Sequence, residues 1–262
     1  GPNEKSGNPV YGVISGLGLE YMTDSDRKEV MINLLSNPTV FEVVALGLLG
    51  PDGFHQAFVD LDPEMLGSDK MVAVFDQMRK MRGYVDSNFP GRDWNLATSM
   101  VMNGEAAFQI MGDWAKGEFL AAGKVPGEDF LCASAPGEGF LYNVDSFAMF
   151  DVSGDDKQQG QALLAKLIVG QNFQKVFNLN KGSIPARVDV AMDDFDSCAH
   201  LSSAEMTTSS KDGSLLPSYA HGMAMRGAQS GAITDVVTAH FNSDMSSAEA
   251  VEMLVAAVEN SL

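Results

Sequence analysis

Apolar residues recur along much of the chain at the three- and four-residue spacing that marks one face of an α-helix. The clearest example begins at Ser68, a favourable N-cap residue, and ends before Gly83, a favourable helix stop. Its apolar positions are Met71, Val74, Phe75, Met78 and Met81. This spacing predicts a helix over Ser68–Met81 whose apolar stripe packs in a hydrophobic core rather than forming a cofactor site.

Several other segments keep the helical period between residues that end helices. Helices are predicted over 24–35, 39–49, 155–168, 172–178, 224–241 and 246–259, and another is predicted to end at residue 122. Short apolar runs predict strands over 9–18, 106–111, 130–133 and 146–150, the first of them running into a Gly-rich turn. The helix over 39–49 is nearly all apolar and should be buried. Helices with short strands between them indicate an α/β or α+β fold.

The composition limits the classes of function. With 262 residues and 45% apolar content, the chain can bury the core of one large domain or two small ones. The 17 Lys and Arg residues against 35 Asp and Glu give a formal net charge of −18, which disfavours nucleic acids and anionic membranes as partners. No apolar run approaches the roughly 20 residues that span a bilayer. The first residues lack a basic region followed by an apolar stretch, so we expect the signal peptide to be absent from this chain.

The two cysteines, Cys132 and Cys198, form no Cys-x-x-Cys pair. They suit neither a zinc ribbon nor a thioredoxin-type site, which leaves either a disulfide or two buried thiols. A disulfide would add on the order of 4 kcal/mol of stability and would indicate an oxidising compartment. The histidines at positions 55, 200, 221 and 240 lack the spacing of a zinc site, so no metal is expected.

Two stretches resemble cofactor motifs but fail at a decisive position. Glycines 12, 16 and 18 follow a predicted strand, as in a dinucleotide-binding loop, but Tyr21 stands where the motif opened by Gly16 needs its third glycine. Residues 151–156 resemble half of a calcium loop, but Ala162 occupies the twelfth position, where a Glu is needed. We interpret the first as a turn and the second as a helix cap, and we expect no cofactor.

A set of aromatic and polar residues lies where predicted strands or helices end. Its members are Trp114, Asn143, Asp145, Lys181 and His221. Each has a structural interpretation as well: a core aromatic, a turn or cap residue, a solvated charge or a loop histidine. Together they suit a sugar, because a pyranose presents a C–H face to an indole ring and hydroxyls to amides, carboxylates and ammonium groups.

Six stretches of the chain resemble a known family. They are RGYVD (82–86), GRDWNLAT (91–98), MGDWAKGEF (111–119), YNVDSFAMF (142–150), VFNLNKGSIPAR (176–187) and AHGMA (220–224). They closely resemble the carboxyl-terminal part of periplasmic glucose/mannose-binding proteins. These belong to family 1 of the extracellular solute-binding proteins and serve ABC-type sugar importers. The likeness runs in order from about Thr39 to Leu262, and its long motifs make an accidental match implausible.

The resemblance implies a two-lobed α/β receptor in the periplasm, with a helix-rich fold of the type II periplasmic-binding-protein class. Such a receptor closes on a sugar and presents it to a membrane permease. By motif, Trp114 would stack on the pyranose, and Asn143 and Asp145 would bind hydroxyls. Lys181 and His221 would add hydrogen bonds. The two cysteines match the positions of the family's cysteine pair, which implies a disulfide between them.

The resemblance also implies a domain division. Residues 1–38 match nothing in the family and are interpreted as a divergent, added or replacement segment, while 39–262 form a carboxyl-terminal lobe from a truncated receptor. In this fold the segment 145–189 crosses over to pack on the amino-terminal lobe, which is largely absent here. We therefore expect the helix over 155–168 to expose an apolar face, unless residues 1–38, a second chain or a swapped protomer covers it. The face consists of Leu163, Leu164, Leu167 and Ile168.

The absent lobe bears on function. Losing about half the hydrogen bonds of a cleft between lobes, at about 0.5–1.5 kcal/mol each, should leave weak sugar binding or none. An alternative is an engineered or partner-completed scaffold in which the sugar site is idle. A glycosidase using Asp113 and Asp145 as paired carboxylates is disfavoured, because the resemblance points to binding and the spacing does not demonstrate the pair. We therefore do not expect an enzyme.

Overall fold

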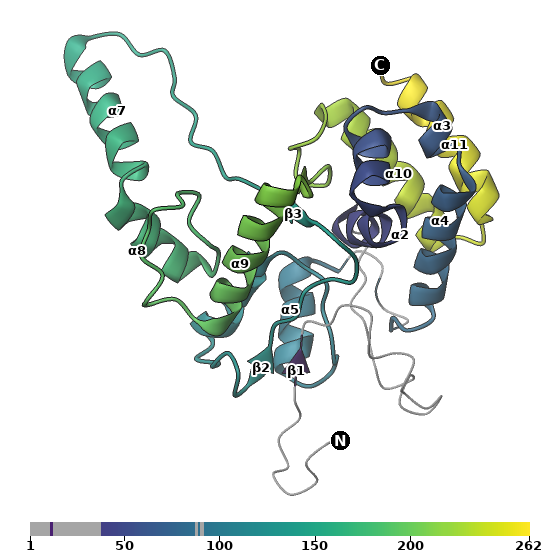
Figure 1. Cartoon of the computed structure of the whole chain (residues 1–262), viewed down its shortest axis with the longest axis horizontal. Coiled ribbons are helices and arrows are strands. Elements are labelled where there is room, and N and C mark those ends of the chain that lie inside the picture. The colour runs from purple at the N-terminus through teal and green to yellow at the C-terminus, as the bar shows by residue number, and fades with distance from the viewer. Residues whose placement is uncertain (1–10, 13–37, 87–88, 90–91) are drawn as a thin grey trace, which may run out of the picture.

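The computed structural model of the chain describes residues 11–12, 38–86, 89 and 92–262 (Figure 1). Helices dominate these ranges, together with two separate pairs of short parallel strands. The helices are α2 (Pro38–Phe58), α3 (Pro63–Leu66), α4 (Asp69–Arg82), α5 (Trp94–Met102), α6 (Lys116–Ala121), α7 (Asp155–Ile168), α8 (Gln171–Lys181), α9 (Ser197–Asp212), α10 (Gly227–Asn242) and α11 (Ser247–Glu259). The strands are β1 (Tyr11–Gly12), β2 (Phe130–Leu131), β3 (Phe140–Tyr142) and β4 (Leu215–Pro217), and a short 3-10 helix, η2 (Asp113–Ala115), precedes α6. This agrees with the predicted helix-rich α/β pattern.

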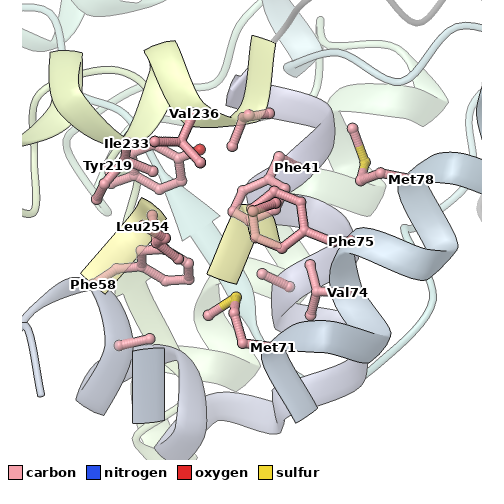
Figure 2. Packing of buried hydrophobic residues seen from close by; sticks show 14 of the residues in the cluster. Phe41, Phe58, Met71, Val74, Phe75, Met78, Tyr219, Ile233, Val236 and Leu254 are labelled. Atoms are coloured by element: carbon pink, nitrogen blue, oxygen red, sulfur yellow. The ribbon is translucent and has the colours of Figure 1, made fainter. Parts of the chain in front are cut away.

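The main core lies between α2, α4, α10 and α11 (Figure 2). Aromatic rings pack at its centre, where the ring centroids of Phe41 and Phe75 are 5.0 Å apart. The helix predicted over Ser68–Met81 is α4, and all five of its predicted apolar positions are buried. The Ser68 hydroxyl accepts a hydrogen bond from the Met71 N–H at 3.3 Å, as expected of an N-cap.

The first long helix, α2, bends at Gly50-Pro51. Gly50 has φ of 70°, a left-handed conformation that glycine adopts without strain, and Pro51 lacks the N–H that a continuous helix needs. The helix predicted over 39–49 is present and largely buried, but the chain resumes as helix after the bend and continues to Phe58. Gly50 and Pro51 thus mark a bend within α2 rather than its end.

A second, smaller cluster joins α5, α6 and β2 to the start of α9. In it, Phe119 and Phe130 pack with ring centroids 4.4 Å apart, beside the buried Val101. Cys132 and Cys198 form a disulfide, and their Cα atoms are 5.5 Å apart. The bond implied by the resemblance is confirmed, and it ties the segment after β2 to α9.

Helices α7 and α8 form an arm that stands apart from the main core (Figure 1). Residues 143–154 lead from β3 to α7 without regular structure. No residue of α7 is buried, and Leu163, Leu164 and Leu167 are 68%, 54% and 58% exposed. Ile168 is partly covered. The apolar face expected on this helix is therefore exposed in the structure.

Two strand predictions are wrong, since residues 106–111 form only a single β-bridge residue, Phe108, and residues 146–150 form no strand. Side chains also hold the first segment, because Gln109 accepts from the Thr98 hydroxyl at 2.9 Å and donates to the Trp94 carbonyl at 3.1 Å. The second runs along the exposed connection to the arm. The pair of β3 and β4 was not predicted, because neither strand is long enough to have an alternating pattern.

Part of the sequence prediction lies outside the described residues. The strand predicted over 9–18 is described only at Tyr11–Gly12, which pairs with β2 as β1, and the helix predicted over 24–35 is not described. Within the described ranges, none of the helices is both long enough and apolar enough to cross a membrane. In the same ranges, no three His, Cys, Asp or Glu side chains are grouped to hold a metal ion.

Candidate functional site

A cavity of about 1020 Å³ lies between α2, η2, α8 and the segments that follow β3 and β4. Because β3 and β4 are parallel, and the Ser218 N–H donates to the Tyr142 carbonyl at 3.0 Å, the segments after the two strands lie side by side. The carboxyl ends of parallel strands are a common position for ligand sites in α/β folds. All five predicted site residues line this one cavity: Trp114, Asn143, Asp145, Lys181 and His221.

Trp114 lies in η2 and is half-buried at the cavity surface, so it is not a core residue. Its indole ring meets the His221 ring edge to face, with centroids 5.0 Å apart and an interplanar angle of 80°. The contact fixes the two rings relative to each other in one wall of the cavity. A partly exposed indole among polar groups can stack on the apolar face of a ligand.

Asp145 follows β3 and Lys181 ends α8, and their side chains form an ion pair at the base of the arm. The Lys181 ammonium also lies 5.9 Å from the centroid of the Phe177 ring. Gly182 packs directly on α6, where an added Cβ atom would lie 2.4 Å from the backbone nitrogen of Gly117. Only glycine fits this contact, and it holds the end of α8 beside the turn that carries the indole.

Asp113, considered above only as half of a catalytic pair, also lines the cavity. Burial raises the pKa of this carboxyl group to about 6, while the ammonium groups of Lys116 and Lys181 act in the opposite direction. The group therefore accepts hydrogen bonds when it is ionised above this pH and can donate one when it is protonated below it.

Glu42 and Ser218 belong to the site but were missed in the sequence. The Glu42 side chain, in α2, is 2% exposed and accepts hydrogen bonds from the Ser218 hydroxyl at 2.7 Å and the Ala220 N–H at 3.1 Å. The Ser218 oxygen also lies 2.7 Å from Nδ1 of His221. One signal for Glu42 was present in the sequence, since it is the only acidic residue in the nearly all-apolar helix predicted over 39–49. A buried carboxylate needs hydrogen-bond partners, so its position indicates a polar site nearby.

An α/β fold with a cavity of this size, lined by an indole and several polar groups, is typical of proteins that bind a small ligand. The family of bacterial extracellular solute-binding proteins matches residues 35–202. The chain belongs to this family. Membership means binding rather than catalysis, so the expectation that the chain is not an enzyme is confirmed and the glycosidase alternative is rejected.

Curated relatives are similar over most of this chain. A probable sugar-binding periplasmic protein of Brucella suis biovar 1 (strain 1330) is 53% identical over 223 residues, which are 84% of this chain and 52% of the relative. A protein of the same description from Rhizobium meliloti (strain 1021) is 52% identical over 223 residues, or 84% of this chain and 53% of the relative. An uncharacterized ABC transporter extracellular-binding protein of Pyrococcus horikoshii is 30% identical over 200 residues, or 76% of this chain and 44% of the relative. The chain thus spans about half the length of the curated relatives it matches.

Two solved structures share the fold. A Streptococcus pneumoniae solute-binding protein, in complex with the blood group A-trisaccharide, aligns with a TM-score of 0.66 at 16% identity, over 88% of this chain and 59% of its own. A chitin oligosaccharide binding protein aligns with a TM-score of 0.67 at 15% identity, over 90% of this chain and 61% of its own. The expected solute-binding-protein fold is confirmed.

Proposed function

We propose that this chain is the sugar-binding part of a periplasmic receptor for an ABC-type importer, and that its ligand is a hexose of the glucose/mannose type. The names of the relatives support sugar binding and the link to an ABC transporter. The observation that carries the proposal is the gathering of Trp114 and four hydrogen-bonding side chains around one cavity. The membrane permease of the importer is the partner that this role requires.

Each side chain has a role in this proposal. The Trp114 indole stacks on the C–H face of the pyranose. Asn143 both donates and accepts, Asp145 accepts from hydroxyls, and Lys181 donates. His221, packed against the indole, adds a further hydrogen bond. A neutral polyol suits this mixed set, because each ligand hydroxyl is both a donor and an acceptor.

Replacing Trp114 by alanine should weaken hexose binding by about 1–3 kcal/mol, or roughly 5- to 150-fold, because the stacking surface is lost. Saturation-transfer NMR with glucose and mannose at millimolar concentration measures the change. Trp94→Ala is the matched control, since Trp94 is 37% exposed and lies in α5 outside the lining of the cavity. An equal loss in both variants, or none in Trp114→Ala, would reject the assigned site.

The exposed face of α7 supports a second part of the proposal. Residues 39–262 form one lobe, and the crossover segment 145–189 packs the apolar side of α7 on the other lobe of a longer receptor. The length of the relatives agrees with this division, because the matched region is 52% of the Brucella protein. We therefore expect this chain alone to bind sugar weakly. The comparisons do not support a second chain or a swapped protomer in that place.

Replacing Leu163, Leu164 and Leu167 together by glutamine should lower the binding of a hydrophobic dye without lowering stability. The three side chains are more than half exposed, and surface substitutions usually change stability by less than about 0.5 kcal/mol each. Dye fluorescence and urea unfolding measure the two quantities. Leu96→Gln, at another position that is 55% exposed, is the control. A loss of several kcal/mol in the triple variant would mean that the face packs within this chain.

A further inference from the structure

Behind His221, a series of hydrogen bonds leads from the cavity into the protein interior. Ser218 Oγ donates to Glu42 Oε1 at 2.7 Å and lies 2.7 Å from His221 Nδ1. The same Oγ accepts from the backbone N–H of His221 at 3.2 Å. The other Glu42 oxygen, Oε2, accepts from the Ala220 N–H at 3.1 Å. Glu42 and Ser218 are each 2% exposed, so water competes little for these bonds.

The positions of the hydrogens follow from counting donors. A carboxylate has no hydrogen to donate, so Ser218 uses its single hydroxyl hydrogen on Glu42. The Ser218 oxygen can accept two hydrogen bonds, and one of them comes from the His221 backbone N–H. The other comes from the imidazole, which means that Nδ1 carries a hydrogen. A neutral imidazole has only one ring hydrogen, so Nε2 is left as an acceptor.

We propose that Glu42 and Ser218 are positioning residues that hold His221 as its Nδ1–H tautomer and so present Nε2 as a hydrogen-bond acceptor for a ligand hydroxyl. His221 lines the cavity and its side chain is 23% exposed. Among the residues that the structure describes, none is hydrogen-bonded to Nε2. The hydroxyl-bearing ligand rests on the proposed function, whereas the tautomer does not.

The hydrogen bonds that run from Glu42 through Ser218 to His221 are called the relay below. The relay fixes the orientation of the imidazole ring as well as its tautomer. Turning the imidazole over by half a turn would put a ring carbon where Nδ1 now bonds to Ser218, and the edge-to-face contact with Trp114 constrains the plane of the ring. A fixed acceptor favours a ligand that offers a hydroxyl hydrogen at this point over one that offers only an ether or carbonyl oxygen. Glu42 and Ser218 thus contribute to specificity without touching the ligand.

The first test is the tautomer of His221 in the unliganded chain. Long-range ¹H–¹⁵N NMR at about pH 8, where imidazoles are neutral, distinguishes a ring nitrogen that carries a hydrogen from one that does not. His221→Gln identifies the His221 signals among those of the four histidines. We expect the Nδ1–H form. A predominant Nε2–H form, or a mixture of both forms, would overturn the proposal.

Glu42→Gln tests the relay, because it keeps the shape of the side chain and replaces one acceptor oxygen by an N–H donor. The Ala220 N–H retains the amide oxygen, so the amide nitrogen faces Ser218 and donates to it. Ser218 then donates to Nδ1, and His221 is expected to switch to the Nε2–H form. A purely structural role of Glu42 would not move this tautomer. An unchanged tautomer in a folded Glu42→Gln variant would contradict the proposal.

Glu205→Gln is the matched control for this substitution. Glu205 lines the same cavity but contacts Ser134 rather than His221. The tautomer of His221 should therefore stay as in the wild type. If Glu42→Gln does not fold, as judged by thermal unfolding, the wild-type tautomer still decides the proposal.

Ligand affinity is a separate readout. Glu42→Gln should weaken hexose binding roughly 3- to 10-fold, which corresponds to one hydrogen bond, and Glu205→Gln should weaken it less. A switched tautomer with unchanged affinity would overturn the role of Nε2 toward the ligand. A wild-type chain that binds no hexose would contradict the proposed function, whereas the tautomer would still test the relay.

Discussion

Replacing Asp196 by alanine is expected to lower the free energy of unfolding by about 3–5 kcal/mol. The Lys116 ammonium, on a side chain that is 4% exposed, lies 2.8 Å and 2.7 Å from the two carboxylate oxygens of Asp196. Removing the carboxylate leaves a buried positive charge without this partner. It also removes the N-cap of α9, where Asp196 accepts from the Ala199 N–H at 3.0 Å. Urea unfolding followed by circular dichroism measures the loss.

A double-mutant cycle separates the two contributions of Asp196. In a Lys116→Met background the buried ammonium is absent, so Asp196→Ala should lower the free energy of unfolding by only about 1 kcal/mol, the value of a helix cap. Asp194→Ala is a control, because the exposed Asp194 side chain pairs with the partly exposed Lys175 side chain at the surface, where ion pairs contribute little. Equal losses with and without Lys116 would contradict the role of the buried ion pair.

Removing the disulfide should have a similarly large effect. Cys132 and Cys198 are 66 positions apart, and the loop-entropy relation for a loop of that length gives about 4 kcal/mol. The double variant Cys132→Ser, Cys198→Ser should therefore unfold at a clearly lower urea concentration than the oxidised wild type. The substituted side chains differ little in size, so most of the change reflects the lost bond.

A reducing agent provides the control for this experiment. Wild-type protein treated with dithiothreitol should unfold at the same urea concentration as the double variant, and the double variant should not respond to dithiothreitol. An unchanged midpoint in reduced wild-type protein would mean that the bond does not stabilise the fold.

The helices could be predicted where their signals are local. The helices α4 and α7 occupy the predicted ranges, and α11 begins as predicted at Ser246, which accepts from the Glu249 N–H at 3.2 Å. In contrast, β3 depends on β4, which lies far along the chain, and so short a strand has no pattern of its own. The helix α9 was missed because its sequence is mostly polar, and its buried start is held by the Asp196 cap and by the disulfide at Cys198.

The candidate site was predictable in its residue types and not in its geometry. The five predicted site residues follow from the chemistry of sugars and from the family motifs, but neither of these gives the distances between the side chains. The parallel pairing of β3 with β4 and the glycine contact at the end of α8 bring them together. Glu42 and Ser218 were not predicted from the sequence. Their proposed role is to position His221 rather than to contact a ligand, and such a role leaves no motif in a single sequence.

The arm leaves the cavity at Asp145 and returns to it at Lys181, 36 positions later, and the ion pair of these two side chains joins its ends. Both side chains line the cavity, so the two ends of the arm meet within its wall. A molecule that contacts Asp145 and Lys181 together would therefore touch both points at which the arm joins the rest of the chain.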